Sequence, residues 1–345
     1  MQLYTPSSPH IHSGSSVSQL MHRVLLALIP GYVMYVALFG WGVVANLMIA
    51  VLTAYACETL MLLLRKRPLA PFLSDHSALV TASLLAISLP PLAPWWIVVI
   101  GIAFAIIIAK HLYGGLGYNP FNPAMVGYVV LLVSFPRELT TWAGPQEINN
   151  VSIGIADAIH ISIFGTLGSG AGIDTVTMAT PLDHLKTEIS RGQSISDIIP
   201  ASPIFGNLGG NGWEWISLAF LAGGLWLLYK KVIQWYIPVS MLTALVLIST
   251  VFHLIDPERY ADPVFHLVTG ATILGAFFIA TDPITASTTE KGRLIYGAGI
   301  GILVYIIRTW GGYPDGVAFG VLLMNILAPT LDYYTQPRPY GERKG

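Results

Sequence analysis

The chain has 345 residues, of which 54% are hydrophobic and only 10% charged, and its formal net charge is −1. Soluble globular domains carry charge on about 25% of their residues, so lipid is the expected solvent for much of this surface, and the lack of basic excess argues against a nucleic-acid partner. The single cysteine, Cys57, excludes an internal disulfide and makes a cysteine-ligated metal centre unexpected, so we expect no metal site.

Ten apolar segments are expected to cross the membrane as helices, because each offers most of the roughly 20 apolar residues that a span needs. The N-terminal segment lacks the pattern of a cleavable signal peptide, so the first apolar run is expected to remain as a helix. The expected spans are 24–40, 42–64, 77–93, 95–110, 121–135, 213–229, 235–254, 264–281, 293–310 and 315–332. The predicted fold is an all-α polytopic membrane protein.

The distribution of basic residues predicts the orientation of these spans. With the N-terminus in the cytoplasm, 12 of the 17 Lys and Arg residues fall on the cytoplasmic side and 5 on the other side. Cytoplasmic loops carry the excess of basic residues in membrane proteins. We therefore expect both termini on the cytoplasmic side of the membrane.

Three regions follow from this topology. Residues 1–135 hold the N-terminal tail and five spans, residues 136–212 form a large outer (periplasmic) loop, and residues 213–345 hold five spans and the C-terminal tail. The run VSIGIADAIHISIFG within the outer loop is read as a packed or interfacial element. Two halves of five spans have opposite orientations, which makes an inverted repeat a candidate architecture.

A polar, threonine-rich stretch in the outer loop is the first candidate site. It reads DTVTMATPLD from Asp174 and includes Thr177, Ala179 and Thr180. The Thr180 hydroxyl, beside the small Ala179, can accept a phosphoryl group. From the residues alone a turn is the simpler interpretation, because Thr-Pro pairs are common in loops.

Two further segments lie at the cytoplasmic ends of spans four, five and eight. The first reads GGLGYNPFNP, and its glycines permit positive φ and close backbone approach to a ligand; the second reads ATDPITA. The alternatives are a tight connection for the first and a helix cap for Asp282 in the second. The candidate residues are Gly114, Gly115, Gly117, Asn119, Asn122, Thr281 and Asp282.

An ionisable residue inside a span is a candidate functional residue by default. Glu58 lies within the second expected span, about two turns before Arg65. It either lines a cation path or is neutralised by the cluster of Arg65 to Arg67.

Five segments together carry a resemblance that covers most of the chain. They are DHSALVTASLLAISLPP, KHLYGGLGYNPFNPAMVGY, DTVTMATPLD, HLVTGATILGAFFIATDPITAS and YPDGVAFGVLLMNILAPTLD, running from Asp75 to Asp332. In order and combination they resemble the family of D subunits of Rnf-type (Rsx) ion-translocating electron-transport complexes. They are more distantly similar to the B subunits of the sodium-translocating NADH:quinone oxidoreductase.

The resemblance implies a covalent flavin. In this family a dedicated flavin transferase links FMN through a phosphoester to an outer-loop threonine, which corresponds to Thr180 here. Asp174, Thr177 and Ala179 match the acceptor pattern, whereas Met178 replaces its usual glycine. A second threonine, Thr272, follows a glycine and an alanine but lies within an expected span.

The resemblance also implies a role in electron transfer. Such a complex passes electrons between ferredoxin and NAD and couples this to Na⁺ or H⁺ movement. The expected partners are the A, B, C, E and G subunits, the flavin transferase and membrane lipid. A non-covalent riboflavin is expected near the GGLGYNPFNP and ATDPITA segments. The alternative from a different class is a flavin-free secondary transporter or channel built from inverted repeats, and a third is a purely structural subunit.

Overall fold

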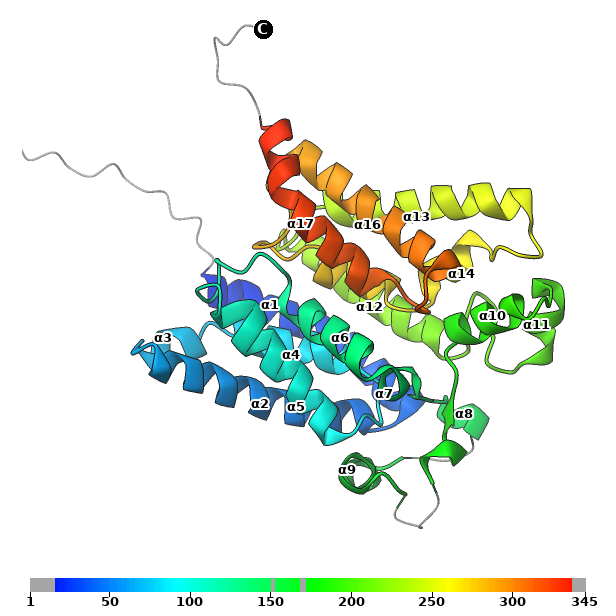
Figure 1. Ribbon diagram of the computed structural model, residues 1–345, viewed down its shortest axis with the longest axis horizontal. Helices are drawn as coiled ribbons and strands as arrows, with labels where there is room; N and C mark the ends of the chain where they lie inside the picture. Colours follow the sequence, from blue (N-terminus) through cyan, green and yellow to red (C-terminus); the bar gives the residue numbers. More distant parts are fainter. Residues whose placement is uncertain (1–15, 150–152, 168–171, 337–345) are drawn as a thin grey trace, which may run out of the picture.

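The computed structural model describes residues 16–149, 153–167 and 172–336, and these form an almost entirely helical protein (Figure 1). The helices of the first half are α1 (Val17–Phe39), α2 (Gly42–Leu64), α3 (Leu69–Leu73), α4 (Ser77–Ser88), α5 (Trp95–Ala103), the π-helical η1 (Phe104–His111) and α6 (Pro123–Ser134). Those of the second half are α12 (Trp213–Tyr229), α13 (Tyr236–Ile255), α14 (Pro263–Val268), α15 (Thr272–Leu274), the π-helical η3 (Gly275–Ile279), α16 (Glu290–Trp310) and α17 (Val317–Thr335).

The expected all-α membrane fold is confirmed. Within the described residues, six helices are long and apolar enough to cross a membrane. Shorter apolar helices cover three more of the expected spans, at Trp95–His111, Pro123–Ser134 and Trp213–Tyr229. The large apolar side chains exposed on these helices are what lipid-facing surfaces require, because the bilayer offers no penalty for them.

Local sequence signals set several helix ends. Ser16 and Gln19 form a reciprocal capping box at the start of α1. Gly40, at φ +85°, ends α1 and lets the chain turn directly into α2. Asn122 caps α6, and Pro123 occupies its first turn, where a missing N–H costs nothing.

The eighth expected span, 264–281, is broken in the middle. It consists of α14, a break at Thr269 to Ala271, and then α15 running into η3. Gly270 adopts φ +63° at the break, a conformation that side chains disfavour. The run of small residues there is compatible with a helix on hydropathy alone, so the break was not predicted.

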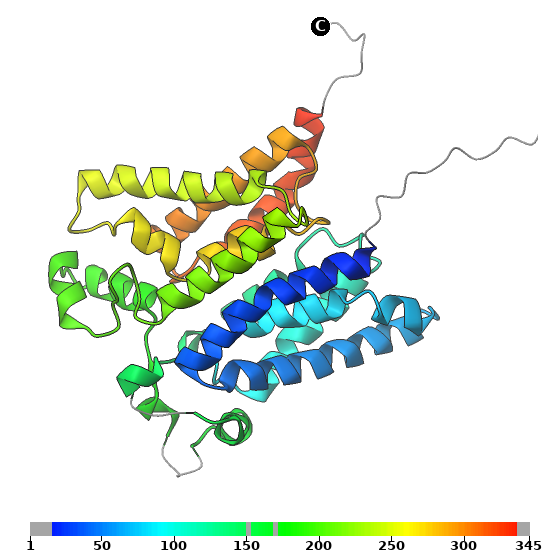
Figure 2. The same cartoon turned by 180° about the vertical axis from the view of Figure 1, so that it is seen from behind.

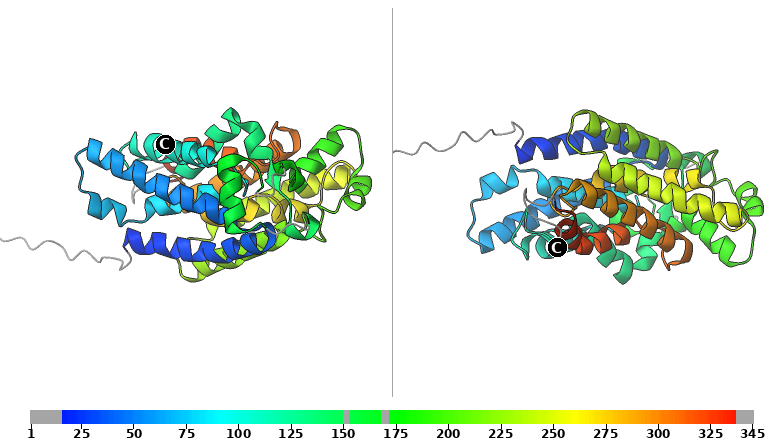
Figure 3. Two further views of the ribbon diagram at one scale, coloured as in Figure 1. Left: turned by 90° about the horizontal axis from the view of Figure 1, so that it is seen from below. Right: turned by 90° about the horizontal axis from the view of Figure 1, so that it is seen from above.

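The two halves meet along α1 and α12, which lie side by side and run in opposite directions (Figures 2 and 3). A Cβ at Gly31 would lie 2.1 Å from the Phe220 ring, and one at Gly223 would lie 2.0 Å from the Ala27 carbonyl oxygen. The last helices of the two halves, α6 and α17, also pack together. The arrangement of first helix against first and last against last fits the inverted repeat.

The middle segment 136–212 packs across one end of the bundle. It contains α7 (Pro136–Thr140), β1 (Trp142–Ala143), α8 (Gln146–Asn149), α9 (Ile155–Phe164), η2 (Ile173–Thr175), β2 (Thr177–Met178), α10 (Pro181–Ser190) and α11 (Ile195–Ala201). β1 and β2 pair antiparallel. Figure 1 shows α9 end-on, so it lies across the direction of the spans, as expected for an interfacial element.

Candidate functional site

Thr180 occupies the N-cap of α10. Its backbone is extended, at φ −72° and ψ 158°, and its Oγ1 accepts a hydrogen bond from the Asp183 N–H at 3.2 Å. Pro181 takes the first helical position, which needs no N–H donor. Capping alone therefore explains a hydroxyl side chain at this position, without any modification.

The rest of the acceptor pattern leads into this cap. Asp174 lies in η2 and is exposed, and Thr177 lies in β2, opposite Ala143. Met178, the residue that replaces the family's glycine, pairs with Trp142 across the two-stranded sheet. In the described residues Asp174 makes no hydrogen bond to Thr180, so the segment is aligned by the sheet and the helix cap.

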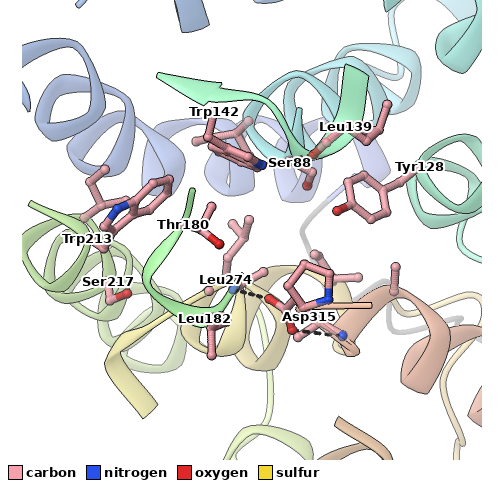
Figure 4. Close-up of a pocket in the computed structure, with 18 of the residues that line it drawn as sticks. Ser88, Tyr128, Leu139, Trp142, Thr180, Leu182, Trp213, Ser217, Leu274 and Asp315 are labelled. Carbon is pink, nitrogen blue, oxygen red and sulfur yellow. Dashed lines mark hydrogen bonds between the residues drawn. The ribbon is translucent and has the colours of Figure 1, made fainter. Parts of the chain in front are cut away.

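The Thr180 side chain borders a cavity between the two halves, which we call the Thr180 cavity (Figure 4). Trp142 and Trp213 flank Thr180 in this space. Two buried polar atoms of its wall, Tyr35 Oη and Trp213 Nε1, have no hydrogen-bond partner within the described part of the chain. Buried polar groups normally have partners, so these atoms are free to bind a ligand.

The broken helix forms the opposite wall of the Thr180 cavity. Asp315 accepts a hydrogen bond from the Ala271 N–H at 2.8 Å and pairs with Arg308 at 3.1 Å. Arg308 in turn donates to the carbonyl oxygens of His266, at 2.7 Å, and Thr269, at 3.2 Å. Arg308 is buried and supports the break.

Thr272 cannot serve as an alternative acceptor in this fold. Its side chain is fully buried, and its hydroxyl donates to the His266 carbonyl oxygen at 2.7 Å. A transferase acting from solution has no access to a side chain that is buried in the bundle.

A second cavity lies toward the other end of α1 and α12. The structure brings four of the predicted residues together in its wall: Asn119, Asn122, Thr281 and Asp282. We call it the Asn119–Asp282 cavity. Gly114, Gly115 and Gly117 are not among its lining residues; they shape the loop at φ values of +132°, +103° and +92°, and Leu116 contributes to the wall instead.

The polar side chains that line the Asn119–Asp282 cavity differ in whether they already have hydrogen-bond partners within the protein. Asn122 is committed to the fold, because its Oδ1 caps α6 and its N–H donates to Asn325 Oδ1 at 3.1 Å. Asp282 accepts from the Thr285 hydroxyl at 2.8 Å. Asn119 Oδ1, by contrast, is buried and has no partner among the described residues, which leaves a free acceptor at the cavity.

Glu58 is buried, but its partner is not the arginine cluster. Its carboxylate binds Lys110 at 2.9 Å and lies 3.1 Å from His111 Nε2. Arg65 instead donates to the His111 carbonyl oxygen at 3.1 Å. Of the two alternatives for Glu58, neutralisation by the cluster of Arg65 to Arg67 is therefore wrong.

Lys110 is one of the 12 basic residues that the predicted topology assigns to the cytoplasmic side. No local sequence pattern predicts that it pairs with Glu58. Lys110 is in fact 2% exposed and belongs to η1. The only available signal was its position at the end of an uninterrupted apolar run. Arg308, which the predicted topology assigns to the other side of the membrane, is buried as well. Leaving out one basic residue from each side keeps the excess of basic residues on the cytoplasmic side.

Comparison with known proteins agrees with this architecture. The model of the NQR2, RnfD, RnfE family matches residues 4–341. The D subunit of the ion-translocating oxidoreductase complex of Escherichia fergusonii is 54% identical over 346 residues, covering 98% of each chain. The proteins of the same name from Shigella dysenteriae serotype 1 and Escherichia coli strain SE11 are 53% and 54% identical over the same share. The chain therefore belongs to the NQR2, RnfD, RnfE family, which confirms the resemblance identified from its motifs.

Proposed function

We propose that this chain is the flavin-carrying D subunit of an Rnf-type complex, a translocase that couples electron transfer between ferredoxin and NAD to Na⁺ or H⁺ movement. Family membership over nearly the whole chain supports a subunit of an ion-translocating oxidoreductase. The observation that carries the flavin role is the position of Thr180, whose hydroxyl borders a cavity between the two halves.

Thr180 carries FMN as a phosphoester in this proposal. The start of α10 is a favourable place for the phosphate, because free N–H groups and the helix dipole stabilise negative charge there. Burial raises the pKa of the Asp183 carboxyl in the same turn, although nearby Lys186 and His184 oppose the rise. Trp142 and Trp213 offer aromatic surfaces to the ring. The cofactor supplies the electron-transfer chemistry, and the protein positions it.

The Asn119–Asp282 cavity holds a non-covalent riboflavin in the same proposal. Its walls are mostly apolar and carry a few polar groups, as is typical of ligand pockets. Asn119 Oδ1 supplies a free acceptor for the ring N–H, and Phe277 and Phe278 supply apolar surface.

Acid extraction of the purified subunit tests this second site. A flavin is expected in the extract in addition to the one that remains covalently bound. Asn119→Leu, which keeps the side-chain size but removes the acceptor, is expected to lower the extracted flavin about tenfold, since one hydrogen bond to a buried group contributes on the order of 1.5 kcal/mol. Asn207→Leu, at an exposed position, is the matched control. An extract free of flavin would show that the cavity does not bind one.

A flavin-free secondary transporter is the alternative function, and two observations favour it: the inverted halves and the broken helix. Transporters use free carbonyl groups at such a break to bind ions. Here Arg308 occupies the carbonyl oxygens of His266 and Thr269. A flavin that survives denaturation in SDS distinguishes the two functions.

The subunit works within a larger assembly in this proposal. Its partners are the A, B, C, E and G subunits, and a flavin transferase acts on the middle segment from the periplasmic side. Both termini lie on the cytoplasmic side of the bacterial inner membrane. Glu58 remains a candidate residue of the ion path.

Cysteine accessibility tests this orientation. In a Cys57→Ala background, Gln193→Cys, in the exposed turn after α10, is expected to react with a membrane-impermeant maleimide in intact cells. Lys230→Cys, exposed at the end of α12, is expected to react only after the cells are opened. Labelling of both positions in intact cells would contradict the proposed topology.

A further inference from the structure

Glu58 and Lys110 form an ion pair in the interior of the first half. Lys110 Nζ donates to both carboxylate oxygens of Glu58 at 2.9 Å and to Ser77 Oγ at 2.8 Å. These contacts use all three donors of the ammonium group. The two charged side chains are 2% and 1% exposed. Burying an ion pair in such apolar surroundings costs free energy. Its position beside the Asn119–Asp282 cavity therefore indicates a function.

The pair lies beside the Asn119–Asp282 cavity, with Lys110 nearer to it than Glu58. Lys110 and Ser77 both line this cavity, whereas Glu58 lies behind them and does not. Lys110 belongs to η1, where the π-helical winding departs from that of α5 and changes the direction in which side chains project. Such segments are frequent at functional sites.

The remaining walls are suited to a planar ring with one polar edge. Asp282, Thr281 and the free Asn119 Oδ1 supply polar atoms, while Phe277 and Phe278 are apolar. Lys110 is thus a cation that borders a largely apolar cavity. Charges interact more strongly in such surroundings than in water.

We propose that Lys110, held in place by Glu58, sets the reduction potential of the flavin in the Asn119–Asp282 cavity. This inference rests on the proposed second flavin. Reduction adds negative charge to the ring, and a neighbouring ammonium group stabilises that charge and raises the potential. The Glu58 carboxylate partly cancels the ammonium field, so the pair holds the potential at an intermediate value.

Potentiometric titration of the full-length subunit tests the proposal. Thr180→Asn serves as the parent, because it removes the covalent flavin and leaves only the non-covalent one to report. Glu58→Gln removes the cancelling charge and is expected to raise the potential. The double variant Glu58→Gln/Lys110→Met removes both charges and is expected to lower it below the parent. Each shift should reach about tenfold in the equilibrium constant, which is about 30 mV for a two-electron couple.

Glu58→Gln and the double variant are expected to shift the reduction potential in opposite directions. This difference separates an electrostatic role of Lys110 from a structural one. Lys110→Arg, which keeps the charge, should stay closer to the parent than the double variant does. Equal potentials in the parent and in Glu58→Gln, with flavin bound in both, would overturn the role of Lys110 while leaving the second flavin intact. No extractable flavin in the parent would overturn both. If the double variant does not fold, the sign of the Glu58→Gln shift still decides the question.

Discussion

Replacing Thr180 with alanine is expected to abolish the ultraviolet-excited fluorescence of the denatured subunit completely. The phosphoester requires the Thr180 hydroxyl, and Thr272, the other threonine in a comparable sequence, is buried in the bundle. Thr272→Ala should therefore leave the fluorescence unchanged. Mass spectrometry of the peptide from Ile173 to Lys186 should show the mass of FMN less one water in the unaltered protein.

A matched variant separates the modification from the helix cap. Thr180→Ala also removes the N-cap of α10, which costs about 1 kcal/mol. Thr180→Asn keeps a good capping side chain but has no hydroxyl, so it should lose the fluorescence while α10 stays intact. Fluorescence retained by Thr180→Asn, or an unmodified peptide from cells that express the transferase, would contradict the covalent site.

Arg308→Leu is expected to destabilise the subunit by about 3–5 kcal/mol, the cost of leaving one partner of a buried charge pair alone. Asp315 would lose its cation, and the carbonyl oxygens of His266 and Thr269 would each lose the donor that Arg308 supplies. Thermal unfolding of the detergent-purified protein should show the loss as a lower midpoint.

The control for this variant is another arginine on the same half. Arg259 is exposed, so Arg259→Leu should change stability by no more than about 0.5 kcal/mol. Because Arg308 and Asp315 shape one wall of the Thr180 cavity, the Arg308 variant should also carry less covalent flavin. Equal stability of the two variants would mean that the helix break does not depend on the contacts of Arg308.

Hydropathy predicted the helices that are continuous and failed where the backbone departs from a regular helix. The first two spans agree with α1 and α2 because Gly40 and Trp41 interrupt a long apolar run at a recognisable turn. The break at Gly270 was missed since small apolar residues are compatible with either state. Only the packing of Arg308 and Asp315 against the open backbone makes the broken form stable.

The residues of the candidate sites likewise divide into those that the sequence predicted and those that it did not. Asn119 and Asp282 were predicted to lie together because topology placed both at the same end of the bundle, and they share a cavity. The pairing of Glu58 with Lys110 was missed, because 52 residues of sequence separate them and nothing local records the contact. Trp142 and Trp213 were likewise missed, since aromatic side chains near span ends are common in any membrane protein.

The two cavities adjoin along one seam. Met125 and Ile279 border the Thr180 cavity, and the residues just before them, Ala124 and Phe278, border the Asn119–Asp282 cavity. Each cavity takes walls from both halves. A small rotation of one half against the other would therefore reshape both at once. By thermodynamic reciprocity, an occupant of either cavity that favours one angle changes the affinity of the other cavity by the same factor.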